Sequence, residues 1–179
     1  MPEVEIRPAV SVDIPFLVEL EHACQSQYVW QMERTVQDTQ VNVAFREIRL
    51  PRAVRVEYPR RPAQLHETWK HRSGLLVGVV NGKPAAYVAL NEKSETSAVW
   101  MSDLVVDERW RRQGVGTAMM LAAQDWAIQR NMRRLILELP SKNSPAIHLA
   151  FKMGFEFSGY HDMYFANQDI ALFFARYLR

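Results

Sequence analysis

The stretch Asp103–Gly116 constrains the fold more than any other part of the chain, because an apolar strand, a short basic turn and the start of a helix follow one another in it. Leu104, Val105 and Val106 are apolar and partly β-branched, which is typical of a strand covered on both faces. Residues Thr117–Gln129 contain neither proline nor glycine and carry apolar residues at helical spacing. The chain is therefore expected to pass from a buried strand directly into a helix.

The turn between them, Arg111–Gly116, has the sequence Arg-Arg-Gln-Gly-Val-Gly. Two glycines separated by one residue let the backbone approach a ligand closely. The start of a helix adds unpaired N–H donors and a partial positive charge, and the arginines add full charge. These features predict a site for a phosphate or pyrophosphate, although Gly114 alone could serve only to pack the helix against the strand.

Two common phosphate motifs are excluded, because the turn lacks both Gly-Lys-Ser/Thr and a third glycine at dinucleotide spacing. The turn instead resembles the acyl-CoA pyrophosphate loop of the GNAT superfamily of N-acetyltransferases. The sequence pattern of that loop is Gln/Arg-x-x-Gly-x-Gly/Ala, where x is any residue. The second signature of that family is an asparagine that opens a short helix closing in Gly-Phe, and Asn143 and Gly154-Phe155 match it. Together the two matches cover roughly residues 74–155.

Composition indicates a single globular domain, which the resemblance identifies as one GNAT-like N-acetyltransferase domain spanning residues 1–179. Hydrophobic residues make up 48% of the chain, which is enough for a core, and the net charge of +2 is too small to indicate a nucleic-acid partner. The only cysteine, Cys24, fits a reducing compartment, and no apolar run is long enough to cross a bilayer. We expect a cytoplasmic protein without a membrane partner.

The clearest local prediction is a tight hairpin, since Asn81-Gly82 separates two apolar runs and favours a type I′ turn. A first helix is expected from about Asp13 to about Cys24, capped by Ser11 or Asp13. Asn131 is expected to close the helix that follows the basic turn, and Ser144 to cap the next one. The remaining expected strands are 4–7, 98–106, 135–139, 155–164 and 170–177.

The resemblance implies that the segment 25–72 is variable and builds the acceptor side. Its residue pattern indicates a hairpin or small β-excursion, followed by a short helix over 62–71. It is locally basic, and its arginines form either a solvated outer face or a cationic wall for an acidic acceptor or the 3′-phosphate of CoA. These arginines are Arg46, Arg49, Arg52, Arg55, Arg60 and Arg61.

The order of elements predicts an α/β fold, of the α+β type, with a central mixed sheet and helices on both faces. The resemblance implies that two parallel strands, one ending at Val106 and one starting at Leu135, splay apart and admit the pantetheine arm of acetyl-CoA. It implies no metal and leaves a homodimer possible. The residues that it places at the cofactor are Leu104, Val105, Val106, Arg111, Arg112, Gln113, Gly114, Val115, Gly116, Thr117 and Asn143.

Acyl transfer to an amine requires a neutral amine, and holding a lysine-like amine neutral at pH 7 costs about 4.6 kcal/mol. A carboxylate or histidine could take the proton. Asp103 is the first choice because it lies in the central strand near the gap, although it could instead be a structural carboxylate paired with a local arginine. The other candidates are Glu138, His71 and His161, whereas His22 and His66 are expected on the surface.

The chain differs from the family at the residue that protonates the leaving thiolate. Many GNAT enzymes have a tyrosine at this position, where this chain has Ala150. Departure without an acid is about 1.5 pKa units uphill at pH 7, or about 2 kcal/mol, which slows transfer without abolishing it. Tyr160 and Tyr164 are candidates for this catalytic role, or are rim aromatics with solvated hydroxyls.

The resemblance thus predicts an N-acetyltransferase that moves an acetyl group from acetyl-CoA to a primary amine of a small molecule or a protein, by direct attack in a ternary complex. The segment Tyr160–Tyr164 resembles both streptothricin and ribosomal-protein alanine acetyltransferases and does not choose between them. Ala150 keeps a second hypothesis open, a non-catalytic acyl-CoA-binding module or sensor.

Overall fold

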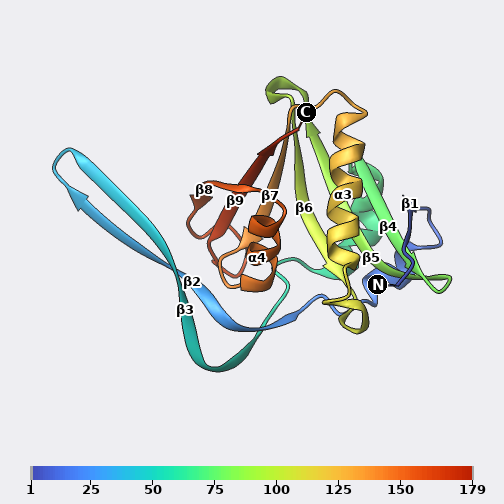
Figure 1. Ribbon diagram of the computed structural model, residues 1–179, viewed down its shortest axis with the longest axis horizontal. Helices are drawn as coiled ribbons and strands as arrows, with labels where there is room; N and C mark the ends of the chain where they lie inside the picture. The colour runs from blue at the N-terminus through green and yellow to red at the C-terminus, as the bar shows by residue number, and fades with distance from the viewer. Residues whose placement is uncertain (1, 179) are drawn as a thin grey trace.

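A computed structural model describes residues 2–178 and has a seven-stranded mixed sheet with a separate two-stranded ribbon (Figure 1). The strand order of the sheet is β1-β4-β5-β6-β7-β9-β8, and only β6 and β7 pair in parallel. The mixed α/β prediction is confirmed. The strands of the sheet are β1 (Glu5–Pro8), β4 (Gly74–Val80), β5 (Lys83–Lys93), β6 (Ala98–Val106), β7 (Arg134–Pro140), β8 (Glu156–His161) and β9 (Ala171–Tyr177).

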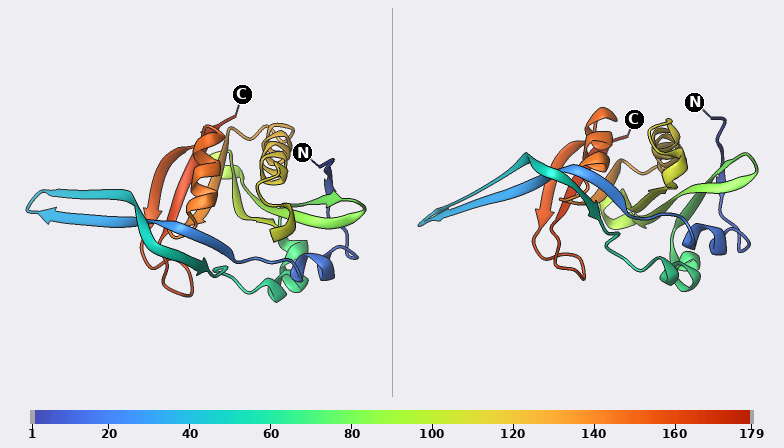
Figure 2. Two further views of the ribbon diagram at one scale, coloured as in Figure 1. Left: turned by 60° about the horizontal axis from the view of Figure 1, so that its bottom comes forward. Right: turned by 90° about the horizontal axis from the view of Figure 1, so that it is seen from below.

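Helices cover both faces of the sheet and enclose one apolar core on each side (Figure 2). On one face lie α3 (Val115–Ile128), which contributes Met119, and α4 (Ser144–Lys152), which contributes Ile147. On the other face, Leu17 and Leu65 of two short helices fill the second core. Those helices and the 3₁₀ turns are α1 (Ile14–Val18), α2 (Leu65–Thr68), η1 (Pro62–Gln64), η2 (Trp69–His71), η3 (Ser94–Thr96) and η4 (Glu108–Trp110).

Left-handed residues stand where the sequence predicted turns and helix ends. Asn81 and Gly82 have φ angles of 51° and 74°, as the type I′ turn between β4 and β5 requires. Asn131 has a φ of 58° just beyond α3, and Gly154 has a φ of 76° just beyond α4. These local predictions are confirmed.

The first helix is shorter than predicted, because α1 ends at Val18 and β2 already begins at Cys24. The intervening backbone is drawn toward the basic turn, since the guanidinium of Arg111 donates hydrogen bonds to the carbonyls of Glu21 and Ala23. Asp13 precedes α1 but does not cap it with its side chain.

The carboxylate of Asp13 is used by other partners. It accepts hydrogen bonds from the Arg7 guanidinium at 2.7 and 2.9 Å and from the amide of Val10 at 2.8 Å. The hydrogen bond from Arg7 lowers the pKa of Asp13 and ties β1 to the start of α1.

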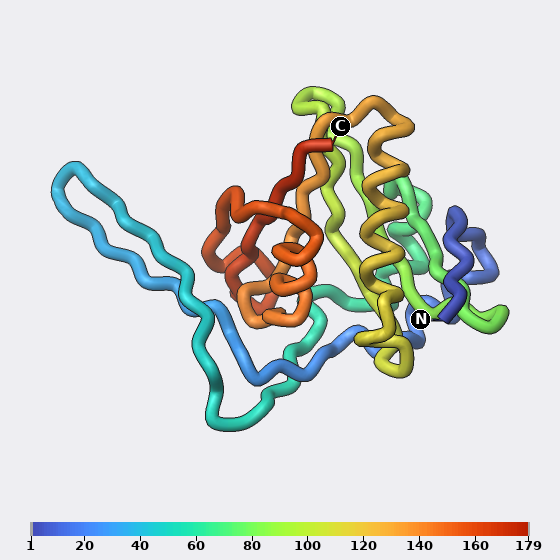
Figure 3. The backbone as a smooth tube through the Cα atoms, in the orientation of Figure 1, coloured from blue at the N-terminus to red at the C-terminus, as the bar shows by residue number. Residues whose placement is uncertain are grey.

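The predicted excursion is a long antiparallel ribbon formed by β2 (Cys24–Gln37) and β3 (Gln40–Val56). Its register slips between Ser26 and Tyr28, which marks a bulge. The chain can be followed in Figure 3 from α1 into the ribbon and back beneath α4 toward α2, while the distal half projects away from the sheet. A hairpin was predicted correctly here, but its length was not.

The predicted splay of the parallel strands is present. Residues Ala98–Met101 of β6 pair with Arg134–Leu137 of β7, and the pairing stops there. On the other side of β6, Ala89 and Leu90 of β5 face Asp103 and Met101, so Ser102 is an extra residue in β6. Such a bulge bends a strand. We infer that it turns β6 away from β7 and opens the gap.

Candidate functional site

The basic turn lies between η4 and α3 and contains two left-handed residues. Gly114, which immediately precedes α3, has a φ of 88°, and Arg112 has a φ of 62°. Glycine adopts this conformation freely, whereas for a residue such as arginine it costs about 1 kcal/mol or more. Strained residues of this kind cluster at ligand-binding positions, so the backbone of the turn is itself a sign of function.

The amides of residues 112–117 are free for a ligand. No carbonyl or side chain between residues 2 and 178 accepts a hydrogen bond from them, and the first bond of α3 runs from the Ala118 amide to the Gly114 carbonyl at 3.0 Å. Consecutive unpaired N–H groups at a helix N-terminus form an anion site. This geometry agrees with the phosphate-binding prediction.

The two arginines of the turn have different roles. Arg111 donates to the carbonyls of Val106 at 2.8 Å and Ala23 at 2.7 Å, as well as to Glu21, so its guanidinium is occupied within the protein. The guanidinium of Arg112 has no hydrogen-bond or ion-pair partner in the described part of the chain and faces the groove. Arg112 is therefore available to a phosphate, as expected from the sequence, whereas Arg111 is not, and phosphate binding itself stays a prediction.

A groove runs from the basic turn toward the gap between β6 and β7. Its first section has a volume of about 510 Å³ and contains Gly114, Gly116 and Thr117. The second section, about 180 Å³, is lined by Leu104–Val106 and Asn143. Both sections share Arg112, Gly116, Pro145 and Leu149.

Two of the predicted cofactor residues lie outside this groove. The side chain of Gln113 donates back to the Arg109 carbonyl at 2.7 Å. Val115 is fully buried in the core beneath α3, so only its amide is available. Asn143 rather than Ser144 caps α4, by accepting from the amide of Ala146 at 3.2 Å, while Ser144 donates to Glu47 of the ribbon.

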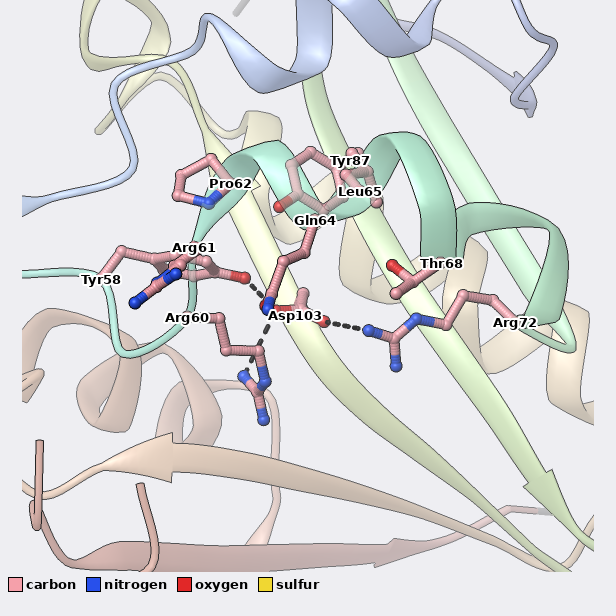
Figure 4. Close-up of a pocket in the computed structure, with 10 residues that line it drawn as sticks. All are labelled: Tyr58, Arg60, Arg61, Pro62, Gln64, Leu65, Thr68, Arg72, Tyr87 and Asp103. Carbon is pink, nitrogen blue, oxygen red and sulfur yellow. Dashed lines mark hydrogen bonds and ion pairs between the residues drawn. The ribbon is translucent and has the colours of Figure 1, made fainter. Parts of the chain in front are cut away.

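The groove continues into a small cavity of about 60 Å³ between the parted strands. Asp103 and Glu138 line this cavity from β6 and β7. His22 and Cys24 line both the cavity and the groove, so the two spaces meet at the segment that Arg111 holds. A further cavity of about 50 Å³ lies on the other side of Asp103 (Figure 4).

Asp103 is buried and surrounded by donors, as Figure 4 shows. Its carboxylate accepts hydrogen bonds from the Tyr58 hydroxyl, the Ser102 hydroxyl at 2.7 Å and Arg60 at 3.3 Å, and it pairs with Arg72 at 3.8 Å. A carboxylate has about four lone-pair positions, and here each faces a donor. This favours the structural alternative for Asp103, and its role as a base stays a prediction.

Glu138 lies opposite Asp103 and is less fully occupied. One oxygen accepts from Arg60, and the other accepts from the Tyr164 hydroxyl at 2.9 Å. Arg60 therefore joins the two carboxylates across the gap between β6 and β7. Burial, followed by the charge of Glu138, raises the pKa of Tyr164, so its hydroxyl stays protonated and donates to Glu138.

Tyr160 lies apart from this cluster and packs edge-on against Phe45, with ring centroids 5.2 Å apart. Neither Tyr160 nor Tyr164 is among the described residues that line the groove or its two cavities. His71 and His161 are exposed and do not line these spaces either. The structure does not bring these side chains to the groove.

The sequence interpretation missed His22, which is half-buried rather than on the surface. Its Nδ1 is 2.6 Å from the Leu20 carbonyl and its Nε2 is 3.2 Å from the Tyr87 hydroxyl. Burial lowers the pKa of His22 and raises the pKa of Cys24, so both are neutral at pH 7. No local pattern indicates either residue, because the long-range contact with Arg111 brings them to the site.

The fold and the groove together define a protein with unpaired amides at a helix N-terminus beside splayed parallel strands. The profile of the Acetyltransferase (GNAT) family matches residues 42–155, so the chain belongs to that family. No helix within residues 2–178 is long and apolar enough to cross a membrane.

Two curated relatives are similar over part of the chain. Streptothricin acetyltransferase of Streptomyces lavendulae is 33% identical over 88 residues, which cover 49% of this chain and 46% of that protein. An uncharacterised N-acetyltransferase of Methanocaldococcus jannaschii is 32% identical over 94 residues, covering 49% of this chain and 41% of that protein. The matched region thus spans less than half the length of either relative.

Solved structures share the fold over nearly the whole chain. Nourseothricin acetyltransferase has a TM-score of 0.83 at 22% identity, covering 98% of this chain and 99% of that chain. A candidate streptothricin acetyltransferase from Bacillus anthracis, solved in complex with acetyl coenzyme A, has a TM-score of 0.74 at 15% identity and covers 99% and 98%. At these identities the likeness establishes the fold alone.

Proposed function

We propose that the protein is an acetyl-CoA-dependent N-acetyltransferase that acetylates a primary amine of a small molecule by direct attack in a ternary complex. The observation that carries this proposal is the groove that leads from the free amides of residues 112–117 to the carboxylates between β6 and β7. Such a groove lets a thioester and an amine meet from opposite ends without a covalent enzyme intermediate.

Cofactor binding is assigned to the two sections of the groove. The amides of residues 112–117 and the Arg112 guanidinium would hold the diphosphate of acetyl-CoA. The bent end of β6, Leu104–Val106, would lie along the pantetheine arm and offer backbone groups to it and to the thioester carbonyl. One of those groups is already occupied, because the Val106 carbonyl accepts from Arg111.

Proton removal from the acceptor amine is assigned to Glu138 rather than to Asp103. Glu138 lines the cavity between the strands and has two hydrogen-bonded partners, which leaves it lone pairs for the amine. Asp103 then holds Arg60, which in turn positions Glu138. Tyr164 acts on this acceptor side by orienting Glu138, rather than as the acid for the thiolate.

The leaving thiolate lacks the usual tyrosine, since Ala150 is fully buried and has no hydroxyl. Cys24 lies where groove and cavity meet, and its raised pKa keeps it protonated at pH 7. A thiol with a raised pKa is a weaker acid than the CoA thiol, so the departing thiolate takes its proton from solvent rather than from Cys24. The barrier to unassisted departure, about 2 kcal/mol, is small enough for turnover to continue without a dedicated acid.

A small acceptor is supported by the size of the cavities, about 60 and 50 Å³, which suits a slender aliphatic amine better than a folded protein surface. It is also supported by relatives named for streptothricin and nourseothricin. The test is release of CoA thiol from acetyl-CoA with streptothricin, nourseothricin, simple diamines and a peptide with an N-terminal alanine. We expect release with an amine-bearing antibiotic, and no release with any amine in the panel would refute catalysis.

The second candidate function, a non-catalytic acyl-CoA-binding module, is favoured by Ala150. Both functions predict that calorimetry detects acetyl-CoA binding. Only the binding module predicts that no amine causes release of CoA thiol. We further propose that the protein assembles as a homodimer.

The separate roles of the two arginines give a matched pair of substitutions. Arg112→Gln should weaken acetyl-CoA binding about tenfold, the value of a charge-assisted hydrogen bond, with an unchanged melting temperature. Arg111→Gln should instead lower the free energy of unfolding by about 1–3 kcal/mol, because up to three carbonyls lose their donor. Calorimetry and thermal melting distinguish them, and the opposite assignment of effects would contradict the proposed roles.

A further inference from the structure

The distal half of the β2–β3 ribbon is an element without a function in the proposed reaction. It extends beyond the sheet and its helices in every view (Figures 1 and 2). From Trp30 to Val36 the strand advances about 20 Å at the usual rise of about 3.3 Å per residue. An isolated two-stranded hairpin is at best marginally stable in water, so a projection of this length requires a partner surface.

One face of the ribbon is largely apolar, with Arg34 and Glu47 as its charged members, and continues beyond the body of the protein. Near the body, this face carries Trp30, whose ring lies 5.9 Å from that of Phe151, and Phe45, whose ring lies 5.6 Å from that of Phe157. Cross-strand partners share a face, so the same side carries the next pairs outward. Those pairs are Met32 with Phe45, Arg34 with Val43 and Val36 with Val41.

The outer end of this face is exposed, since Val36 and Val41 have 69% and 62% of their surface open to solvent. The opposite face is polar, and it includes the pair Thr35 with Asn42. A ribbon with one polar face and one apolar face that is open to water is typical of a contact surface. The charge of the distal ribbon is balanced, which argues against a nucleic acid or an anionic membrane as the partner.

A surface of matching character lies on the same molecule. A groove of about 590 Å³ runs between the second half of α3 and the start of β8 and end of β9. Its rim is apolar and exposed, with Ile128, Phe157 and Tyr177, the last of which is 75% exposed. Gln124 lines this groove and is more than nine-tenths buried, yet its amide nitrogen has no partner among the described residues.

Charge also matches between ribbon and groove. Arg134, Arg176 and the carboxylate of Glu156 line the groove. Each arginine uses one nitrogen on a backbone carbonyl, that of Thr96 for Arg134 and that of Met153 for Arg176. The turn at the end of the ribbon carries the carboxylate of Asp38, which lies between β2 and β3. An acidic tip beyond an apolar face therefore complements a groove that has an apolar rim and in which two arginines outnumber one carboxylate.

We propose that the protein forms a two-fold dimer in which the distal β2–β3 ribbon of each copy lies in the α3–β8–β9 groove of the other. The reciprocal arrangement covers both apolar ribbon faces at once and closes after two copies. It places Asp38 of one copy near Arg134 of the other. The inference does not depend on the proposed reaction, because neither the ribbon tip nor this groove belongs to the acetyl-CoA site.

The test is the molar mass of the purified full chain, measured by light scattering after size exclusion over a range of concentrations. Wild type should be a dimer. Val36→Glu should raise the dimer dissociation constant at least tenfold, whereas Thr35→Glu, which adds the same charge on the opposite face of the same strand, should leave it unchanged. Circular dichroism and acetyl-CoA binding establish that each variant is folded.

A charge exchange tests the groove itself. Asp38→Arg and Arg134→Glu should each weaken the dimer, and the double variant should recover most of the loss because the pair is restored with reversed sign. A monomer at every concentration overturns the proposal. A dimer that Val36→Glu weakens, but in which the charge exchange has no effect, means that the ribbons bind each other or another surface, and it overturns the assignment to the groove.

Discussion

Replacing Gly114 by glutamate is expected to abolish acetyl-CoA binding while the protein remains folded. The new carboxylate would stand among the amides of residues 112–117, where the diphosphate is proposed to bind, and would repel it. Gly114 also has a φ of 88°, so any side chain there would strain the turn by about 1–3 kcal/mol. We expect the dissociation constant measured by calorimetry to rise more than a hundredfold, which corresponds to about 2.7 kcal/mol.

A matched control separates this effect from backbone strain. Gly82 has a φ of 74° and lies in the exposed β4–β5 turn, where an added Cβ meets nothing within 4 Å. Gly82→Glu therefore introduces the same residue in the same left-handed conformation away from the groove. It should destabilise the protein to a similar extent and bind acetyl-CoA normally. Retained binding in a folded Gly114→Glu variant would mean that the turn does not hold the diphosphate.

The turns and helix ends around the site could be predicted from the sequence, because each is determined by residues at or next to it. Asn81-Gly82 specifies its turn, Asn131 and Gly154 end their helices, and the strand before the basic turn ends in the apolar run Leu104–Val106. The gap between β6 and β7 was predicted only through the resemblance to a family. We attribute the gap to the extra residue Ser102, and that residue can be recognised only from the register of β6 against β5.

The composition of the site could not be predicted in the same way, because it depends on contacts distant in sequence. Arg111 and Arg112 are neighbouring residues of the same type in the sequence, yet Arg111 donates to the carbonyls of Glu21 and Ala23 while Arg112 has no partner among residues 2–178. Arg60 follows the ribbon, and only the fold brings it between two carboxylates. A basic stretch in the sequence could not reveal which of its arginines enters the site.

Replacing Glu138 by glutamine should lower kcat/KM by about 10²–10⁴-fold, which is the usual contribution of general base catalysis. Glutamine has nearly the same shape and still offers an oxygen to Tyr164 or Arg60, but it cannot take a proton from the acceptor amine. The loss should shrink as pH rises toward about 10.4, because a growing fraction of a lysine-like amine is then neutral without a base. A pH profile of thiol release measures both effects.

Asp103→Asn is the comparison that decides between the two carboxylates. Asp103 is buried against Arg60 and Arg72, so removing its charge should destabilise the fold by roughly 3–5 kcal/mol, as breaking a buried ion pair does. The molecules that remain folded should keep a pH profile shaped like that of wild type. In the opposite outcome, Glu138→Gln stays active, and Asp103→Asn is folded but inactive at neutral pH and regains activity at high pH. That outcome would identify Asp103 as the base. In that case Glu138 would serve only to hold Arg60 in place across the gap between the strands.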